Sequence, residues 1–179
     1  MTDDSGRAAS PKEWDAATYH RVADPQFNWG VRVLERLPLA GDETVIDAGC
    51  GSGRLTELLL ERLPRGRVIA LDRSSNMLEA VRGRLLPRHA GRLELMEADL
   101  GALSLEGVAD AVFSTATFHW VLDHRALFGG LRRALRPGGR LVAQCGGAGN
   151  LDRFLARTEA LCAEEPYRRW FQDWTRPHL

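Results

Sequence analysis

Short apolar runs alternate along most of this chain with longer segments in which apolar residues recur at helical spacing. The runs cover about residues 43–48, 67–71, 93–96, 109–114 and 140–145. Helical periodicity covers about residues 13–37, 54–63, 75–86, 126–135 and 151–162. Short runs that are apolar on both faces are typical of parallel strands with helices on both sides. The pattern therefore predicts an α/β fold built on a mostly parallel sheet.

Composition divides the chain into four segments. Residues 1–12 are small and polar, which predicts disorder. Residues 13–41 predict a helical segment, interrupted near Asp24-Pro25 because proline disfavours helix in the residue before it. Residues 42–149 hold the alternating strands and helices, and residues 150–179 predict a C-terminal helical segment. Four aromatic residues recur there at helical spacing, namely Tyr167, Trp170, Phe171 and Trp174. Such a stripe is typical of a core or an interface.

The first predicted strand runs directly into a glycine-rich turn. Asp47 is followed by Gly49, Gly51 and Gly53, and a helical pattern begins at Arg54. Glycine has no Cβ and tolerates positive φ, so such a turn lets a ligand approach the backbone closely. The usual dinucleotide fingerprint is G-x-G-x-x-G, whereas the third glycine here comes one position early. A ligand carrying an amine or a sulfonium suits the leading carboxylate better than a pyrophosphate does.

Polar residues also follow the next three predicted strands. Asp72 comes 19 residues after Gly53, where a carboxylate can accept hydrogen bonds from both hydroxyls of a ribose. Asp99 follows the third strand and could accept from an exocyclic amine such as that of adenine, and Thr115–His119 follows the fourth. Alternatively, Asp72 caps a helix and Asp99 is a solvated loop residue. Their positions at successive strand ends favour the ligand interpretation, because ligands of such folds bind outside the carboxyl ends of the strands.

Together these motifs resemble the class I S-adenosylmethionine-dependent methyltransferases over about residues 14–150. Residues 47–53 match the family's first motif, acidic-x-Gly-x-Gly-x-Gly; Val68–Ser74 resembles the ribose-binding motif, Glu97–Leu100 the adenine-contacting motif, and Leu135–Leu141 the turn before the fifth strand. The resemblance implies a Rossmann-like, doubly wound sheet and S-adenosyl-L-methionine as cofactor. The residues that it implies for cofactor binding are Tyr19, Asp47, Gly49, Gly51, Gly53, Asp72, Arg73, Met77, Ala98, Asp99, Leu100 and Thr115.

Within that family, Phe118–Phe128 and the N-terminal Trp14-Asp15 resemble a small-molecule branch that includes the trans-aconitate and malonyl-carrier-protein methyltransferases. This implies methyl transfer to a small acceptor, a carboxylic acid by O-methylation being the expected one. A carboxylate acceptor needs no general base, whereas an alcohol or an amine does. His119 is the candidate catalytic residue, either as that base or as a group that only orients the acceptor. Trp120 is the candidate residue for contact with the acceptor. Tyr19 and the first helix either form a lid over the cofactor or are ordinary aromatic packing.

Composition and charge exclude several other functions. The 24 basic and 24 acidic residues balance, which argues against a nucleic-acid or membrane-surface partner. Cys50, Cys145 and Cys162 have neither the pattern of a disulfide framework nor metal-ligand spacing, so no metal is expected. No apolar run approaches the roughly 20 residues that span a bilayer, and the N-terminus has no signal-peptide core. A cytoplasmic location is therefore expected.

The pattern departs from the family after the fifth predicted strand. The family's sheet normally has seven strands, but we predict no sixth or seventh strand in residues 150–179. The fifth strand would then leave an open sheet edge, and a homodimer that covers it is a hypothesis. Two alternatives remain open. One is a non-catalytic or truncated cofactor-binding module. The other is an NAD-dependent dehydrogenase, against which the glycine spacing and Asp47 argue.

Overall fold

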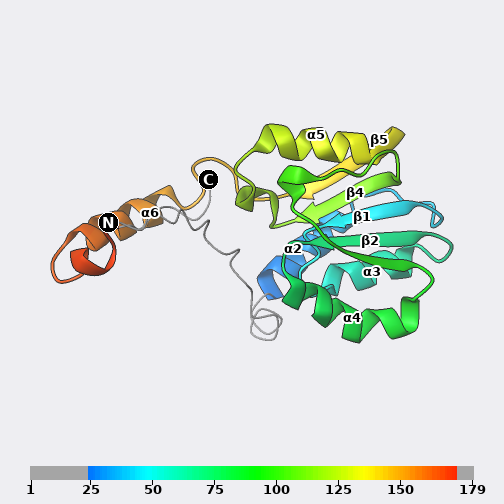
Figure 1. Ribbon diagram of the computed structural model, residues 1–179, viewed down its shortest axis with the longest axis horizontal. Coiled ribbons are helices and arrows are strands. Elements are labelled where there is room, and N and C mark those ends of the chain that lie inside the picture. Colours follow the sequence, from blue (N-terminus) through cyan, green and yellow to red (C-terminus); the bar gives the residue numbers. More distant parts are fainter. Residues whose placement is uncertain (1–23, 173–179) are drawn as a thin grey trace, which may run out of the picture.

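The fold is built on one sheet of five parallel strands, seen in a computed structural model that describes residues 24–172 (Figure 1). The strands lie in the order β3-β2-β1-β4-β5, and every neighbouring pair is parallel. Their bounds are Thr44–Ala48 for β1, Arg67–Asp72 for β2, Leu93–Glu97 for β3, Ala109–Thr115 for β4 and Leu135–Gln144 for β5. The strand order reverses between β1 and β4, which is where doubly wound folds bind their ligands. The predicted α/β class is confirmed.

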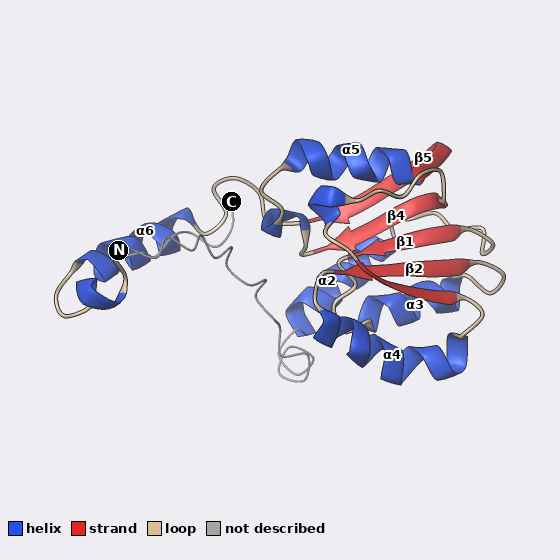
Figure 2. Cartoon of the chain, viewed as in Figure 1, coloured by secondary structure: helices blue, strands red, loops and turns tan. Residues whose placement is uncertain are grey.

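Helices cover both faces of this sheet (Figure 2). Helices α2, α3 and α4 lie on one face and α5 lies on the other. The helices are α2 (Asp24–Leu34), α3 (Arg54–Arg62), α4 (Ser75–His89), α5 (His124–Ala134) and α6 (Asp152–Ala163). Three short 3-10 turns, η1 (Leu100–Ala102), η2 (Phe118–Trp120) and η3 (Arg168–Trp170), complete the described elements. Among residues 24–172, no helix combines the length and the apolar character needed to cross a membrane.

Alternate residues of the central strands feed two separate cores. Val45 and Phe113 pack with the apolar faces of α2, α3 and α4, whereas Ile46 and Val112 pack with α5 and the loop before β4. All four are completely buried. Burial of side chains of this size stabilises the fold by about 1.5–3 kcal/mol each relative to exposure. This two-sided burial is why the strands read as apolar runs rather than as alternating patterns.

Two predicted boundaries near prolines differ from the structure. Helix α4 runs through Pro87 to His89, whereas the predicted helical period ended at about residue 86. Pro87 is exposed and lies in the last turn, so it removes one hydrogen bond without displacing a packed residue. Near Asp24-Pro25 we predicted an interruption within a longer helix, and α2 begins there. Proline is tolerated in the first turn of a helix, where its missing N–H has no intrahelical partner.

The predicted turn before the fifth strand lies inside β5 as a bulge. Leu135 pairs with Ala109 and Arg140 pairs with Ala111, so residues 136–139 stand against the single residue Asp110 of β4. Gly138 has φ of 80°, which suits glycine. Strand β5 is therefore longer than predicted and is the edge strand next to β4.

The described part of the C-terminal segment projects away from the sheet (Figure 1). Helix α6 has one buried residue, Leu155. Tyr167, Trp170 and Phe171 are 44, 72 and 41% exposed and surround the short turn η3. The predicted aromatic stripe is thus not part of a core within the described residues, and Trp174 lies outside them.

Candidate cofactor site

The strands present their carboxyl ends at one edge of the sheet, which we call the carboxyl rim (Figure 2). The turn of residues 49–53, called the glycine turn below, follows β1 at this rim. Asp72 follows at the end of β2, and Ala98 and Asp99 directly after β3. The sequence-predicted residues of these segments therefore gather at the carboxyl rim. Tyr19 lies outside the described residues.

All three glycines of the glycine turn have positive φ. The angles are 80° at Gly49, 53° at Gly51 and 80° at Gly53. The odd spacing of the motif thus marks three successive positions that glycine adopts at low cost. The main-chain N–H groups of Gly49 and Cys50 both donate to the carbonyl oxygen of Leu71, at 2.8 and 2.9 Å, so the turn is fixed to the end of β2.

The Asp72 carboxylate holds the glycine turn directly. One oxygen accepts from the main-chain N–H of Gly51 and the other from that of Ser74, both at 2.9 Å. Burial raises the pKa of this carboxyl group. The side-chain cap of α4 is Ser74, whose hydroxyl oxygen accepts from the N–H of Met77 at 3.3 Å. Each carboxylate oxygen has a second lone pair, so Asp72 retains acceptor capacity for ribose hydroxyls.

Asp47 is buried behind the start of α3. Its side chain is 2% exposed, and one oxygen accepts from the Thr56 hydroxyl at 2.6 Å. Burial raises the pKa of Asp47 to about 7; the bond from Thr56 lowers it, and the nearby Asp72 charge raises it further. Asp47 therefore joins β1 to α3, while its negative charge lies beneath the turn where a cationic ligand group would be attracted.

Replacing Asp47 with asparagine should make the protein without ligand more stable above about pH 7 and weaken its binding of a cationic ligand. The pKa of Asp47 is about 7 in the folded protein, whereas the ordinary value of an aspartate, taken for the unfolded chain, is 3.8. Between these values the folded state holds a proton that the unfolded state lacks. Stability therefore falls as pH rises through this window, and the full penalty acts above it. Asparagine does not titrate and can still accept from Thr56.

Thermal unfolding of Asp47→Asn and of the native protein across this pH range tests the expectation. The gap in Tm should widen in favour of the variant as pH rises. The matched control is Asp42→Asn, because Asp42 is an exposed carboxylate at the opposite edge of the sheet. A constant gap between Asp47→Asn and the native protein at every pH would contradict the shifted pKa.

The residues after β3 differ in what they expose. Asp99 is exposed, and one of its oxygens accepts from the N–H of Gly101 at 2.8 Å, capping η1. Ala98 is half-buried, whereas Leu100 is 6% exposed and packs in the core beneath α5. In this arrangement a ligand would reach the side chain of Asp99 more readily than that of Leu100.

The two predicted cofactor contacts that follow β2 also differ in exposure. Arg73 is exposed, and Met77, in the first turn of α4, is 3% exposed. A contact of Met77 with a ligand would therefore require its buried side chain to become accessible from the rim.

Residues 115–121, called the acceptor loop below, begin at the last residue of β4, at the point where strand order reverses. Thr115 is half-buried at the end of β4, and Ala116 has φ of 53°, which is uncommon for a residue with a Cβ. The Ala116 N–H donates to the carbonyl of Gln144 in β5 at 2.8 Å. His119 and Trp120 lie on η2, with ring centroids 5.1 Å apart. Two candidate acceptor-binding residues thus stand side by side at the rim.

The two histidines of this region make different hydrogen bonds. Nδ1 of His119 accepts from the N–H of Gly146 at 3.4 Å. In the neutral ring this assigns the proton to Nε2. Nε2 of His124 lies 3.1 Å from the carbonyl of Phe118, so His124 joins the start of α5 to η2. Asp123 caps α5 by accepting from the N–H of Ala126.

Sequence reasoning missed three hydroxyl residues that hold the rim together. Thr56 bonds to Asp47, the Ser114 hydroxyl donates to the carbonyl of Ala48 at 2.7 Å, and Thr117 packs against Gly49. Thr56 and Ser114 are almost fully buried. Their sequence signal was a small polar residue within an otherwise apolar pattern, which is weak because such residues also occur on solvated faces.

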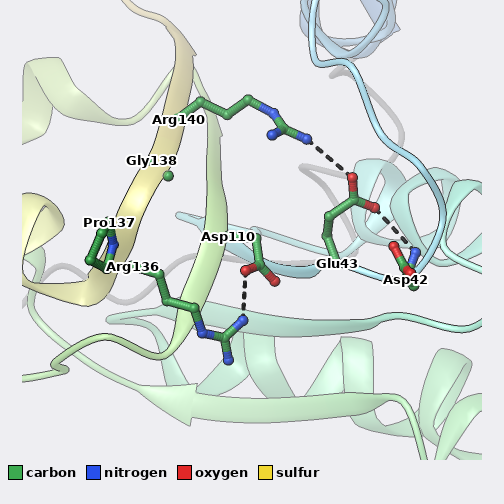
Figure 3. A pocket seen from close by; sticks show the side chains of 8 residues that line it. Asp42, Glu43, Asp110, Arg136, Pro137, Gly138 and Arg140 are labelled. Carbon is green, nitrogen blue, oxygen red and sulfur yellow. Dashed lines mark hydrogen bonds and ion pairs between the residues drawn. The ribbon is translucent and has the colours of Figure 1, made fainter.

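A hollow of about 370 Å³ lies at the opposite edge of the sheet (Figure 3). An Arg136–Asp110 ion pair at 2.7 Å and an Arg140–Glu43 ion pair at 3.1 Å line it. Asp110 also accepts from the N–H of Thr44 at 2.8 Å. These groups join the starts of β1, β4 and β5. No cluster of three or more metal-ligating side chains occurs in the described part of the chain.

Comparison with known families and proteins gives a consistent result. The family described as "Methyltransferase domain" matches residues 45–139. The trans-aconitate 2-methyltransferase of Azoarcus sp. (strain BH72) is 40% identical over 131 residues, which are 73% of this chain and 50% of that protein. The enzyme of the same name from Methylobacterium nodulans is 38% identical over 132 residues, 74% of this chain and 49% of that protein. The chain spans about half the length of these curated relatives.

Solved structures show the same fold. An S-adenosylmethionine-dependent methyltransferase from Mesorhizobium loti superposes with a TM-score of 0.59 at 30% identity, covering 67% of this chain and 53% of that one. Haemonchus contortus phosphoethanolamine N-methyltransferase 2, solved with S-adenosyl-L-methionine, gives a TM-score of 0.67 at 21% identity over 80% of this chain and 36% of that one. The second likeness concerns the fold alone.

Proposed function

The chain belongs to the methyltransferase domain family, and we propose that it binds S-adenosyl-L-methionine and transfers a methyl group to a small carboxylic acid by O-methylation. One observation carries the proposal. At the switch point of the sheet, a turn of three positive-φ glycines is held by the carboxylate of Asp72. The names of the curated relatives support the acceptor class, since trans-aconitate is a carboxylic acid.

The residues of the carboxyl rim fit this cofactor. The glycine turn carries no Cβ at residues 49, 51 and 53, Asp72 can accept from ribose hydroxyls, and Asp99 can accept from an adenine amine. The charge of Asp47 favours a cationic amine or sulfonium over a pyrophosphate. The predicted dehydrogenase alternative is therefore the less favoured one, because this buried carboxylate directly precedes the turn at the helix N-terminus where a dinucleotide places its anionic phosphates.

The chain's own contribution to the reaction is geometry. Bound S-adenosylmethionine supplies an electrophilic methyl group, and the protein fixes that group and the acceptor relative to one another. Near-attack positioning can supply about 7–11 kcal/mol of the barrier. The glycine turn and Asp72 hold one partner, and the acceptor loop with His119 and Trp120 orients the other. A carboxylate acceptor carries its own negative charge, so no residue has to remove a proton from it.

Two measurements test the proposal. Calorimetry should detect binding of S-adenosylhomocysteine and no binding of NADH. A screen of small acids, alcohols and amines with methyl-labelled cofactor should then place label in an acid as a base-labile ester. Binding of NADH in place of S-adenosylhomocysteine would refute the cofactor, and label in alcohols or amines alone would refute the acceptor class.

The non-catalytic module is the second candidate function. It is favoured by one observation: within the described residues no strand follows β5, and α6 projects away from the sheet. It predicts that S-adenosylhomocysteine binds but that no acceptor in the screen becomes labelled. Label transfer to any acceptor would exclude it.

His119 provides a prediction about the acceptor. Its Nδ1 accepts from Gly146, so we expect His119 to orient the acceptor rather than remove a proton. Asparagine can accept that same N–H, so His119→Asn should keep kcat within about tenfold with an unchanged pH profile. His119→Ala removes the atom that accepts the hydrogen bond from Gly146, and this variant should reduce kcat further. Loss of about 10²–10⁴-fold in both variants, together with loss of the acidic limb of the pH profile, would instead identify a general base.

The homodimer remains a prediction. Strand β5 is the edge strand of the described sheet, and Leu141 on it is 37% exposed. Light scattering at high protein concentration should then give twice the mass of one chain. A monomeric mass at all concentrations would contradict it.

A further inference from the structure

We propose that Thr117 is a positioning residue that fixes the acceptor loop against the glycine turn, and thereby sets where the acceptor stands relative to the cofactor. This inference rests on the proposed function. Thr117 belongs to the acceptor loop and lies 68 positions from its partner Gly49 in the sequence. Three sets of contacts support it.

The first contact is between the body of Thr117 and the backbone of Gly49. A Cβ built on Gly49 would lie 2.2 Å from Oγ1 of Thr117, 2.3 Å from Cγ2 and 2.7 Å from Cβ. The threonine side chain therefore occupies the space that any larger residue at position 49 would need. Because Gly49 has φ of 80° and is fixed to Leu71, the surface that Thr117 meets is itself held in place.

The second set consists of the hydroxyl hydrogen bonds. Oγ1 of Thr117 donates to the carbonyl of Thr115 at 2.9 Å and approaches the carbonyl of Gly49 at 3.4 Å. The shorter bond spans Ala116, the residue with left-handed φ, and so stabilises an unusual local backbone. The longer one adds a polar contact to the glycine turn. One side chain thus fixes both the shape of the loop and its position.

The third set transmits this position to the candidate acceptor contacts. The carbonyl of Thr117 accepts from the N–H of Trp120 at 2.9 Å, which closes η2. His119 lies on the same turn and is held at its other side by Gly146. Thr117 is therefore the start of the short turn that carries both side chains. A displacement of Thr117 relative to Gly49 would move His119 and Trp120 relative to the cofactor.

This arrangement predicts separate effects on binding and on turnover. Shortening the Thr117 side chain leaves Asp72 and the glycines of the glycine turn in place, so the affinity for the cofactor should change little. The distance between methyl group and acceptor would no longer be fixed, and a misplacement of about 1 Å can cost about 100-fold in rate. The structure thus distinguishes a positioning residue, which lowers kcat, from a cofactor ligand, which lowers affinity.

The experiment compares Thr117→Ser, Thr117→Val and Thr117→Ala in the full chain. Serine keeps the hydroxyl, valine keeps the volume and alanine keeps neither. Thr44→Ala is the matched control, since Thr44 is a buried threonine with a side-chain hydrogen bond, to Arg67, at the opposite edge of the sheet. Three quantities are measured: the Kd of S-adenosylhomocysteine, kcat and KM for the acceptor, and the ¹⁹F resonance of Trp120 in 5-fluorotryptophan-labelled protein, assigned with Trp120→Phe.

We expect Thr117→Ala to keep Kd within about threefold, to lower kcat by about 10- to 100-fold and to lose the shift of the Trp120 resonance on ligand addition. Thr117→Ser should stay near the native protein, with Thr117→Val between. Thr44→Ala should lower Tm without changing kcat, Kd or the resonance shift. If the native protein binds S-adenosylhomocysteine but no acceptor is found, the Trp120 shift alone decides the inference.

Two results would overturn the inference while leaving the proposed function intact. One is a Thr117→Ala variant with native kcat and a native Trp120 shift. The other is a loss of S-adenosylhomocysteine affinity as large as the loss of kcat, which would make Thr117 part of the cofactor site. Failure of the native protein itself to bind S-adenosylhomocysteine would instead refute the proposed function, and the inference with it.

Discussion

Asp72→Asn should weaken the binding of S-adenosylhomocysteine by about 100-fold, or about 2.7 kcal/mol. The carboxylate accepts from the N–H groups of Gly51 and Ser74, and the amide of asparagine has one acceptor atom for these two donors. Hydrogen bonds to a charged group contribute about 1.5–3 kcal/mol each, and the proposed bonds to ribose lose the same charge. The glycine turn would therefore lose the side-chain hydrogen bond that fixes it in the conformation that binds the ligand.

Calorimetry with S-adenosylhomocysteine measures this loss, and the sheet supplies a matched control. Asp110 also uses both carboxylate oxygens, one for the N–H of Thr44 and one for Arg136, but it lies at the opposite edge (Figure 3). Hydrogen bonding to these groups holds its pKa below the usual range although burial opposes this. Asp110→Asn should therefore reduce Tm with affinity unchanged. Equal losses of affinity in both variants would mean that Asp72 acts only through stability.

Gly49→Ala should both destabilise the protein and abolish ligand binding. A left-handed residue with a Cβ costs about 1–2 kcal/mol, and overpacking against Thr117, only 2.2 Å from the new atom, adds about 1–3 kcal/mol. For a chain of this length the sum corresponds to a fall in Tm of roughly 5–15 °C. Relief of the clash requires movement of the glycine turn or of the acceptor loop, and both line the proposed site.

Gly138→Ala separates the two causes. Gly138 has the same φ of 80°, but a Cβ there would meet no atom within 4 Å. This variant should lose about 1–2 kcal/mol and bind S-adenosylhomocysteine with native affinity. Differential scanning calorimetry and titration of both variants give the comparison. If Gly49→Ala lowered Tm no more than Gly138→Ala and still bound ligand, close packing with Thr117 would not be what requires glycine at position 49.

The features that were predicted correctly depend on neighbours in sequence. The helical period over residues 75–86 predicted the helix that the structure shows as α4, which Ser74 caps by accepting from the N–H of Met77 three residues later. The burial of Met77, Leu78, Val81 and Leu85 followed from their helical spacing. Capping and periodicity act over a few residues, so the chain itself displays them.

The features that were missed depend on contacts between distant segments. The sequence placed Asp47 before the glycine turn, but its burial and its bond to Thr56 follow from how α3 packs on β1. The predicted turn before the fifth strand is a bulge, because Arg140 finds its register against Ala111 in a different strand. The last turn of α4, which includes Pro87, was missed because the prediction relied on the low helix propensity of proline. It did not consider that the buried preceding turns hold the helix in place.

The sequence by itself determined the alternation of strands and helices, the glycine turn and the acidic residues at the strand ends. Hydrophobic period and the conformational freedom of glycine are local properties, and parallel strands bring their carboxyl ends to one edge. Only the tertiary structure decided that Thr117 fills the space above Gly49 and that a hydroxyl holds Asp47 in the interior. Such contacts form when segments tens of residues apart are packed at van der Waals distance, and no spacing along the chain encodes that distance.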